Sequence, residues 1–410
     1  MFQQFLITAF PEPLREGILL AFKFAPIWLP IFLGIAFVKL WMTYVRANFI
    51  NSQEYVLLEL RLPQRVEKSP LAMEAVLAAM HHKTGESSFI NRWVIGKVRP
   101  YFSLEMVSLG GKVHYFIWMR ENFRRLIESN LYAEFPGIEI SEAPDYTRMT
   151  RFDLDEINVH GCDFELVEPD PLPIKTYVDY GLDKDPKEVN KVDPMAHILE
   201  FLASAKSHEQ IWIQILIRMN RAEKKKPGEY FAFMDWKQEA RMLIASIRAN
   251  PEETEERTDG TTIKKLSDGQ KEKIKAIERS ISKLAFDTII RGIYISEADK
   301  FDGGMIPGLL STFKQFNSET LNGFKPTRYN MTLDYPWQDF QGIRENRFRY
   351  KVFDAYRRRA GFYSPYKTRP NVLNTEELAS IFHLPGEGVT TPTLQRVPSQ
   401  RRDAPANLPT

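Results

Sequence analysis

Residues 99–120, RPYFSLEMVSLGGKVHYFIWMR, contain two runs of β-forming residues separated by Gly110-Gly111. The runs Arg99–Leu109 and Lys112–Arg120 are rich in aromatic and branched side chains, and paired glycines between such runs are typical of a tight hairpin. We therefore predict two antiparallel strands here, and the elements on either side of this hairpin define the first domain.

The second strand of this hairpin has apolar side chains on both faces. Alternation places His114, Phe116 and Trp118 on one face, and Val113, Tyr115, Ile117 and Met119 on the other. Helices are expected to cover one face. Exposed aromatics on a sheet can bind RNA bases, but a neighbouring domain or a second subunit is the favoured cover for the other face.

The elements around the hairpin predict a β-α-β-β-α-β order over residues 52–145. They are a strand at Glu54–Pro63, a helix that starts at Ser69-Pro70, the hairpin, a helix at Asn122–Glu134 and a strand at Ile138–Ser141. Serine before proline is a common helix start, and Pro136-Gly137 supplies a turn. This order is the ferredoxin-like plan.

A second round of the same order is predicted over residues 152–333. Its elements are strands at Asp163–Glu168, Gln210–Met219, Phe286–Glu297 and Pro326–Met331, with helices at Pro194–Ala205 and Met305–Phe316. We therefore expect an α+β protein with two ferredoxin-like (βαββαβ) domains, the second interrupted by residues 224–284.

The insertion at 224–284 is predicted to be an antiparallel helical hairpin. Two short apolar seams at spacings of three and four support it: Trp236, Ala240, Leu243 and Ile247, then Ile274, Ile277, Ile281 and Leu284. A coiled coil and an ordinary packed helix pair fit these seams equally well. The acidic, turn-rich stretch Asn250–Thr262 between them is expected to be flexible.

Residues 17–46 are predicted to be a transmembrane anchor. The uncharged run Phe24–Val38 makes a helix of about 22 Å, and extension to Val45 reaches about 33 Å, enough for a hydrocarbon core of roughly 30 Å. The residues that suit a membrane are Trp28, Phe32, Lys39, Trp41 and Tyr44, with the lysine reaching the headgroups and the aromatics near the interface.

A cleaved signal peptide and a buried hairpin are the alternatives to this anchor. The N-terminus lacks a basic start, and no A-x-A site closely follows the apolar run. More basic residues follow the anchor than precede it, which predicts a single-pass protein with its N-terminus outside and its bulk in the cytoplasm. Residues 1–16 are expected to form a short interfacial segment.

Residues 334–386 form a basic C-terminal region that is the main candidate binding site. Its cations are Arg344, Arg347, Arg349, Lys351, Arg357, Arg358, Arg359, Lys367 and Arg369, interleaved with phenylalanine and tyrosine. Cations neutralise phosphates and aromatics stack on bases. Two alternatives stay open, namely an amphipathic helix that packs its aromatics inward and attraction to anionic lipid. Residues 387–410 are expected to be disordered.

Catalysis is not expected from this sequence. It has no P-loop, no G-x-S-x-G and no HExxH, and its single cysteine, Cys162, has no obvious base. The balance of 55 basic and 53 acidic residues, a net charge of +2, also argues against binding of polyanions over the whole surface. We expect no cofactor and no metal.

Several stretches together resemble the N-terminal, non-motor region of membrane-linked type IV secretion and conjugation ATPases of the HerA/FtsK-like kind. Besides the anchor they are Leu58–Pro63, Glu67–Met73, Ser103–Gly111, His114–Trp118, Tyr132–Gly137 and Leu373–Gly386. In that family, a segment like the last one leads into the motor domain, and the chain stops where the motor would begin.

The resemblance implies a non-enzymatic, membrane-anchored component of a DNA or protein transfer machine. Such a component would dock a separate P-loop ATPase, with residues 344–386 as the expected contact. The alternative is a membrane-tethered nucleic-acid-binding module that uses the basic-aromatic stretch 344–369. The sequence leaves homo-oligomerisation open.

Overall fold

The computed structural model describes residues 20, 23–63, 68–86, 88–183, 193–226, 229, 232–256, 262–327, 335, 337–386 and 396–397. The chain divides into two compact units, residues 1–53 with 85–98, and residues 54–84 with 99–410. The expected interfacial segment 1–16 lies outside the described residues. The tail 387–410 also does, apart from Arg396–Val397, which form a short strand, β14.

The first unit contains the long helix α3 (Ala25–Asn51) and the short helix α5 (Phe89–Trp93). Pro26 lies in the first turn of α3, where the missing N–H costs nothing, and Pro30 lies one turn further on. Helix α3 is long and apolar enough to cross a membrane, and an N-terminal signal sequence can have the same length and composition. A long apolar helix at the predicted place is therefore confirmed, although α3 spans residues 25–51 instead of the predicted 17–46.

The second unit is built on one sheet. Nine antiparallel strands and the parallel strand β14 make up this sheet within the described residues, in the order β12-β5-β11-β6-β2-β3-β1-β14, with β4 also paired to β1 and β13 to β11. The strands are β1 (Tyr55–Pro63), β2 (Tyr101–Leu109), β3 (Lys112–Arg120), β4 (Glu139–Glu142), β5 (Ile157–Leu166), β6 (Glu209–Met219), β11 (Ala285–Glu297), β12 (Phe324–Thr327) and β13 (Asn371–Asn374).

The sheet has two halves that correspond to the two predicted rounds. The first half has the order β4-β1-β3-β2 and the second β12-β5-β11-β6. Strands β2 and β6 pair with each other over nine residues, from Tyr101 opposite Arg218 to Leu109 opposite Gln210, and so join the halves edge to edge. The α+β class is confirmed. Two separate ferredoxin-like domains remain a prediction, because the halves share one sheet.

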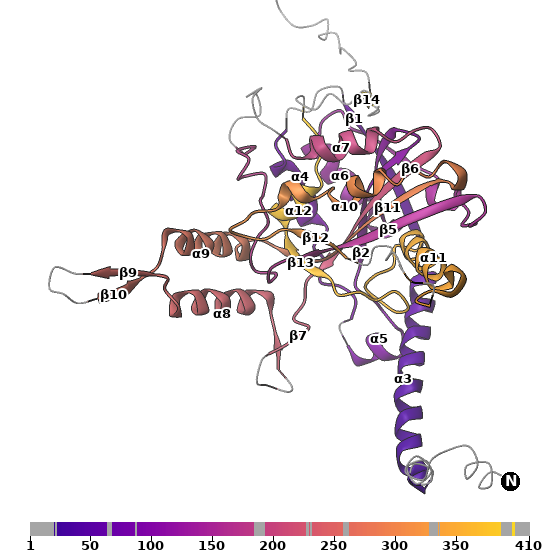
Figure 1. Cartoon of the computed structure of the whole chain (residues 1–410), viewed down its shortest axis with the longest axis horizontal. Helices are drawn as coiled ribbons and strands as arrows, with labels where there is room; N and C mark the ends of the chain where they lie inside the picture. The colour runs from indigo at the N-terminus through magenta and orange to yellow at the C-terminus, as the bar shows by residue number, and fades with distance from the viewer. Residues whose placement is uncertain are drawn as a thin grey trace, which may run out of the picture. The chain divides into compact units, whose positions relative to one another are not determined.

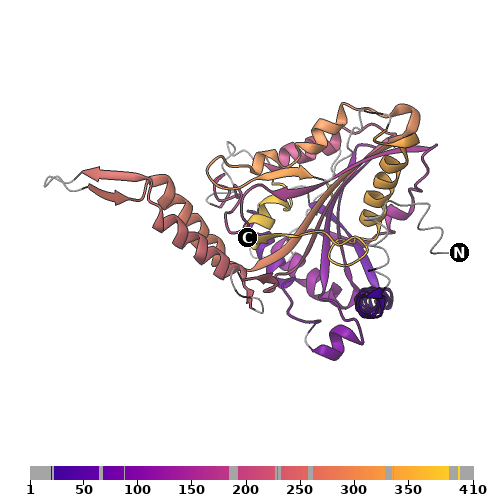
Figure 2. The ribbon, with the colours of Figure 1, turned by 60° about the horizontal axis from the view of Figure 1, so that its bottom comes forward.

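Among the described residues, five helices cover one face of the sheet: α4 (Leu71–Ala79), α6 (Arg124–Glu134), α7 (Met195–Ala203), α10 (Met305–Leu310) and α12 (Thr375–Ile381). Apolar side chains from all five, among them Val76, Leu131 and Ile198, join one buried cluster with alternate residues of the strands. Figure 2 shows these helices on one side of the sheet.

Helix α11 (Ile343–Arg357) covers the opposite face. Phe353 and Tyr356 of this helix join a second buried cluster with Phe116 of β3 and Trp212 of β6. The predicted division of β3 into two apolar faces is thus confirmed, since Tyr115 and Ile117 lie in the first cluster. A neighbouring domain or subunit was the expected cover of the second face. The chain's own helix takes that place, so the aromatic face is not free for RNA.

The insertion contains a helix pair, as predicted. Figure 1 shows the helices α8 (Trp236–Ala249) and α9 (Asp268–Ile281) side by side. They pack through Ala240, Ile244, Ile274 and Ile277. Capping boxes at Asp235 and Ser267 define where the helices begin. In the stretch between them, β9 (Glu253–Glu256) and β10 (Thr262–Lys265) pair as antiparallel strands, and residues 257–261 lie outside the described residues.

Several boundaries differ from the predictions. Strand β5 begins six residues before the predicted Asp163, and β12 ends at Thr327, with 328–331 outside the described residues. The predicted helix Met305–Phe316 divides into α10 and a 3₁₀ turn at Lys314–Phe316. The elements α5 and β13 were not predicted, and α5 lies in the stretch between the first predicted helix and the hairpin.

Helix α12 is buried along its whole length, including its acidic residues. The Glu377 carboxylate accepts hydrogen bonds from the backbone N–H groups of Asn374 and Ile174, at 2.9 and 3.0 Å. Burial nevertheless dominates and raises the pKa of Glu377 from 4.5 to about 8, with a smaller contribution from the neighbouring Glu376.

Glu377 predicts a pH-dependent stability. Between about pH 5 and 8 the folded chain keeps a proton that the unfolded chain has lost, so the free energy of unfolding falls as pH rises, by up to about 1.4 kcal/mol per pH unit. Glu377→Gln should flatten this slope relative to the wild type in denaturant titrations across that range. The exposed Glu319→Gln is the control, and equal slopes in all three proteins would contradict a neutral Glu377.

Candidate functional site

Most of the candidate cations lie on α11, whose start and end are set by local chemistry. The Asp339 carboxylate accepts hydrogen bonds from the backbone N–H groups of Arg344 and Glu345, at 2.8 and 2.9 Å, and so caps the first turn. The helix ends before Arg359, whose φ of 49° is left-handed. Gly161 of β5 makes room for the helix, because a Cβ there would lie 2.4 Å from Cγ1 of Val352.

The helix is amphipathic, with its aromatics turned inward. Phe353 and Tyr356 are buried against the sheet, and so are Phe362 and Tyr363 beyond the helix. These rings are therefore not available to stack on bases. Tyr350 is 45% exposed and is the most accessible aromatic of α11. The packing alternative is confirmed for the buried rings, whereas binding by the cations stays a prediction.

Seven of the nine candidate cations are exposed: Arg344, Arg347, Lys351, Arg357, Arg358, Lys367 and Arg369. We call these seven residues the basic surface. Asp354 offsets part of its charge, because its carboxylate pairs with Arg357 at 3.3 Å and with Arg358 at 2.7 Å. Burial raises the pKa of Asp354, but hydrogen bonds from Tyr366 and Arg358 outweigh it and hold the pKa below its ordinary value.

The other two candidates, Arg349 and Arg359, have structural partners. Arg349 is half-buried and pairs with Glu345 one turn earlier. Arg359 is only 2% exposed, and its guanidinium donates to Glu105 of β2 at 2.9 Å and to Asp145 at 2.8 Å. The Tyr146 hydroxyl donates to the same Glu105 carboxylate at 2.9 Å. Arg359 therefore fastens the chain after α11 to the sheet and is not accessible to phosphate.

Two members of the basic surface, Lys367 and Arg369, line a shallow pocket of about 410 Å³. Arg218, Glu223, Phe362, Thr368 and Pro370 complete its lining. Arg218 is buried, donates to Asp287 at 2.9 Å and lies over the Phe362 ring at 4.5 Å. Its charge is already matched, so Lys367 and Arg369 are the cations that this pocket presents to solvent.

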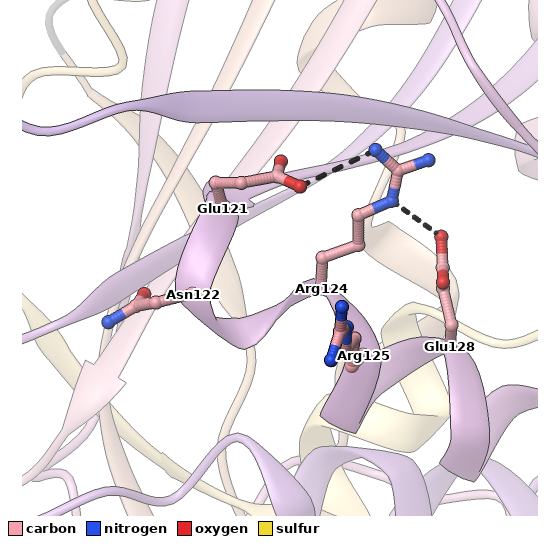
Figure 3. A pocket seen from close by; sticks show the side chains of 5 residues that line it. All are labelled: Glu121, Asn122, Arg124, Arg125 and Glu128. Carbon is pink, nitrogen blue, oxygen red and sulfur yellow. Dashed lines mark hydrogen bonds and ion pairs between the residues drawn. The ribbon is translucent and has the colours of Figure 1, made fainter.

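A second pocket, of about 500 Å³, lies where the 3₁₀ turn Glu121–Phe123 leads into α6. Figure 3 shows the Arg124 guanidinium between the carboxylates of Glu121 and Glu128, which it reaches at 3.5 and 2.9 Å. Glu142 of β4 is a third partner at 2.9 Å. This site is a compensated salt-bridge cluster. Its only signal in the sequence is the charge spacing of three and four residues.

Residues 371–385 of the predicted docking region lie in the interior. Strand β13 pairs with β11, and α12 packs in the first buried cluster through Leu378 and Ile381. The part of 344–386 that can meet a partner is therefore the basic surface and not this segment. Among the described residues there is no group of His, Cys, Asp and Glu side chains able to hold a metal, and Cys162 is buried.

The five predicted membrane residues all lie on α3 and all are exposed. Trp28, Phe32 and Tyr44 expose 46%, 62% and 60% of their side chains. Sequence reasoning missed a neighbouring set in residues 85–98, where Phe89 and Ile90 expose 72% and 61%. The apolar string FINRWVI at 89–95 was the signal that could have identified it.

The Arg359 cluster predicts a large effect from one substitution. Arg359→Met leaves the buried carboxylate of Glu105 without its cation, and we expect a loss of about 3–5 kcal/mol in the free energy of unfolding. Arg357→Met, two residues earlier and exposed, should change it by less than about 0.5 kcal/mol. Guanidinium titration followed by tryptophan fluorescence measures both. Adding Glu105→Gln to Arg359→Met should recover part of the loss, and equal stability of Arg359→Met and wild type would contradict the ion pair.

Comparison with known proteins gives one family. No curated protein matches the chain. A family model described as a domain of unknown function, DUF8128, matches residues 48–396, from the last turn of α3 to β14. The match covers most of the chain and all of the sheet except Val397, so the chain belongs to the DUF8128 family.

Proposed function

We propose that this chain is a non-enzymatic, single-pass membrane protein that holds its sheet unit at the cytoplasmic side of a membrane. The observation that carries the proposal is the run of exposed large apolar side chains from Phe24, the residue before α3, to Tyr44 on α3. Those positions span about 30 Å of helix, the thickness of a hydrocarbon core. Lys39 and Arg46, with Arg61 further on, favour the C-terminal side as the cytoplasmic one.

Contacts within the first unit favour an anchor over a cleaved signal sequence. The indole N–H of Trp41 donates to the backbone carbonyl of Trp93 at 2.8 Å, and Val45 is only 6% exposed. A segment of the later chain thus packs on α3. A signal sequence is removed from the mature protein, and its removal would leave these partners without their contacts.

We further infer that the chain is related to the type IV secretion and conjugation proteins that it resembles, and that each half of its sheet is a ferredoxin-like unit. The strand orders β4-β1-β3-β2 and β12-β5-β11-β6 each match a ferredoxin-like unit, in which the two crossover helices lie on one face. The proposed role is that of a component of a type IV secretion or conjugation machine that docks a separate P-loop ATPase. The basic surface is the proposed contact, because it combines exposure with an excess of positive charge.

The anchor is tested by charge placed in the middle of α3. Each arginine at a helix centre costs about 2.5–3.5 kcal/mol of insertion, so Leu33→Arg with Ile35→Arg should release the chain from membranes on alkaline carbonate extraction. Leu33→Ala with Ile35→Ala is the control and should stay in the membrane fraction. The intact mass of the membrane-bound chain should include residues 25–51. A shorter mature chain that starts after α3 would overturn the anchor.

The docking role is tested by reversing charge on the basic surface. Arg344→Glu, Arg347→Glu and Lys351→Glu together should abolish cross-linking of a P-loop ATPase identified by mass spectrometry from native membranes, because like charges then repel the partner. A matched triple reversal on the helix pair, at Lys237, Arg241 and Lys275, should leave the cross-link intact. Loss of the cross-link in both variants, or no cross-linked ATPase with the wild type, would contradict the docking role.

Nucleic-acid binding by the basic surface is the second candidate function. The exposed cations favour nucleic-acid binding, whereas the buried aromatics do not support base stacking. This function therefore predicts contacts with the phosphate backbone and no stacking on bases. Anisotropy of labelled duplex DNA should then show binding that weakens steeply between about 50 and 200 mM salt and is lost in the same triple reversal. Arg359 must stay intact in such tests, because its substitution disturbs the fold. Salt-insensitive binding would exclude this function.

A further inference from the structure

The segment 85–98 exposes four large apolar side chains that lie close together in sequence. Phe89, Ile90, Val94 and Ile95 are 72%, 61%, 57% and 44% exposed, and they lie on and just after the short helix α5 (Figure 1). Scattered apolar residues on a surface are ordinary. Four of them within seven positions, beside a helix that is itself apolar and exposed, mark a surface that another phase or molecule covers.

Three contacts hold this segment against the C-terminal part of α3. The Trp41 indole donates to the carbonyl of Trp93, and Arg46 pairs with Glu86 at 3.8 Å. Gly96 allows the closest approach. Its φ is +72°, and a Cβ there would lie 2.4 Å from the backbone oxygen of Val45. The chain thus fixes α5 at one level of α3, between Trp41 and Arg46.

That level is one end of the apolar surface of α3. The exposed apolar side chains run from Phe24 to Tyr44, so Trp41 lies in the last turn of a stretch of about 30 Å. Aromatic rings gather there. Phe37 stacks on Trp41 with centroids 6.2 Å apart, and Phe89 stacks on Trp93 at 5.8 Å. Tryptophan and tyrosine prefer this boundary between acyl chains and headgroups.

The charges of the first unit at this level are mainly positive. Lys39 and Arg46 lie on α3, and Arg92 and Lys97 lie in the segment 85–98, with Glu86 as the acidic partner of Arg46. Lysine and arginine beside a membrane surface attract anionic headgroups, each by about 1 kcal/mol. Apolar side chains next to such cations are the pattern of an element that lies in the interface.

We propose that α5 and the residues after it, through Ile95, insert into the lipid interface of the leaflet at the C-terminal end of α3. The occupant of the apolar surface is the boundary between acyl chains and anionic headgroups, which is continuous with the surface around α3. This inference rests on α3 spanning the membrane, as proposed above. It adds a second, peripheral attachment that fixes the rotation and depth of the anchor.

Fluorescence quenching at single positions tests the insertion. The full-length chain is reconstituted in vesicles of three parts phosphatidylcholine to one part phosphatidylglycerol, with an environment-sensitive probe on Ile90→Cys. The native Cys162 is buried, which directs the label to the new thiol. Leu33→Cys reports the centre of α3, and Asp268→Cys on α9 is the exposed control. Lipids with a quencher near the headgroup should reduce the Ile90 signal, deep quenchers should reduce the Leu33 signal, and neither should affect Asp268.

The outcomes separate this inference from the anchor. Deep quenching at Leu33 with an Ile90 probe that behaves like Asp268 overturns the inference and leaves the anchor standing. A blue-shifted Ile90 probe that no lipid quenches means that protein covers the surface, which also overturns it. No quenching at Leu33 overturns the anchor itself. Val94→Cys repeats the measurement at a second position, so that one misfolded variant cannot decide the result.

Discussion

The pairing of β2 with β6 is the interaction on which the second unit depends. Each half of the sheet would otherwise end in a long strand with unpaired N–H and C=O groups, an edge prone to association. Nine residue pairs, from Tyr101 opposite Arg218 to Leu109 opposite Gln210, close these edges against each other. The halves then share one apolar core, because Leu104 of β2 and Ile215 of β6 face the same set of helices.

This pairing also buries a carboxylate, and Arg359 balances its charge. Glu105 and Gln214 lie opposite each other at the junction and are both fully buried. A buried carboxylate needs a cation and further donors. The Arg359 guanidinium, just beyond α11, supplies the cation, and the Tyr146 hydroxyl, from the 3₁₀ turn before β5, is a further donor. The segment that contains α11 and Arg359 thus covers the second face of the sheet and also neutralises the Glu105 carboxylate on that face. The basic stretch is divided by this role, with Arg359 inside and the basic surface outside.

The sequence predicted elements well wherever a pattern was local. The hairpin at Gly110-Gly111, the alternation in β3 and the two seams of α8 and α9 all depend on residues close in the chain. The joining of the halves could not be predicted in this way, since β2 and β6 each carry one apolar face and one mixed face, and nothing local selects their partner. Arg359 illustrates the same limit at the candidate site, because it stands in a run of three arginines and only the position of Glu105 separates it from Arg357 and Arg358.

Burial also distinguishes apolar residues that look alike in sequence. Phe102 and Phe89 belong to similar apolar strings, yet the first is 1% exposed and the second 72%. Removing a side chain of this size from water contributes on the order of 1.5–3 kcal/mol of favourable free energy. The exposed apolar residues of α3 and α5 lack this stabilisation when they face water. Among the described residues, the sheet unit buries most of its large apolar residues in three clusters, whereas within the first unit α3 buries only Val45. A hydrocarbon phase around α3 and α5 would recover that free energy, and this is the physical basis of the proposed membrane attachment.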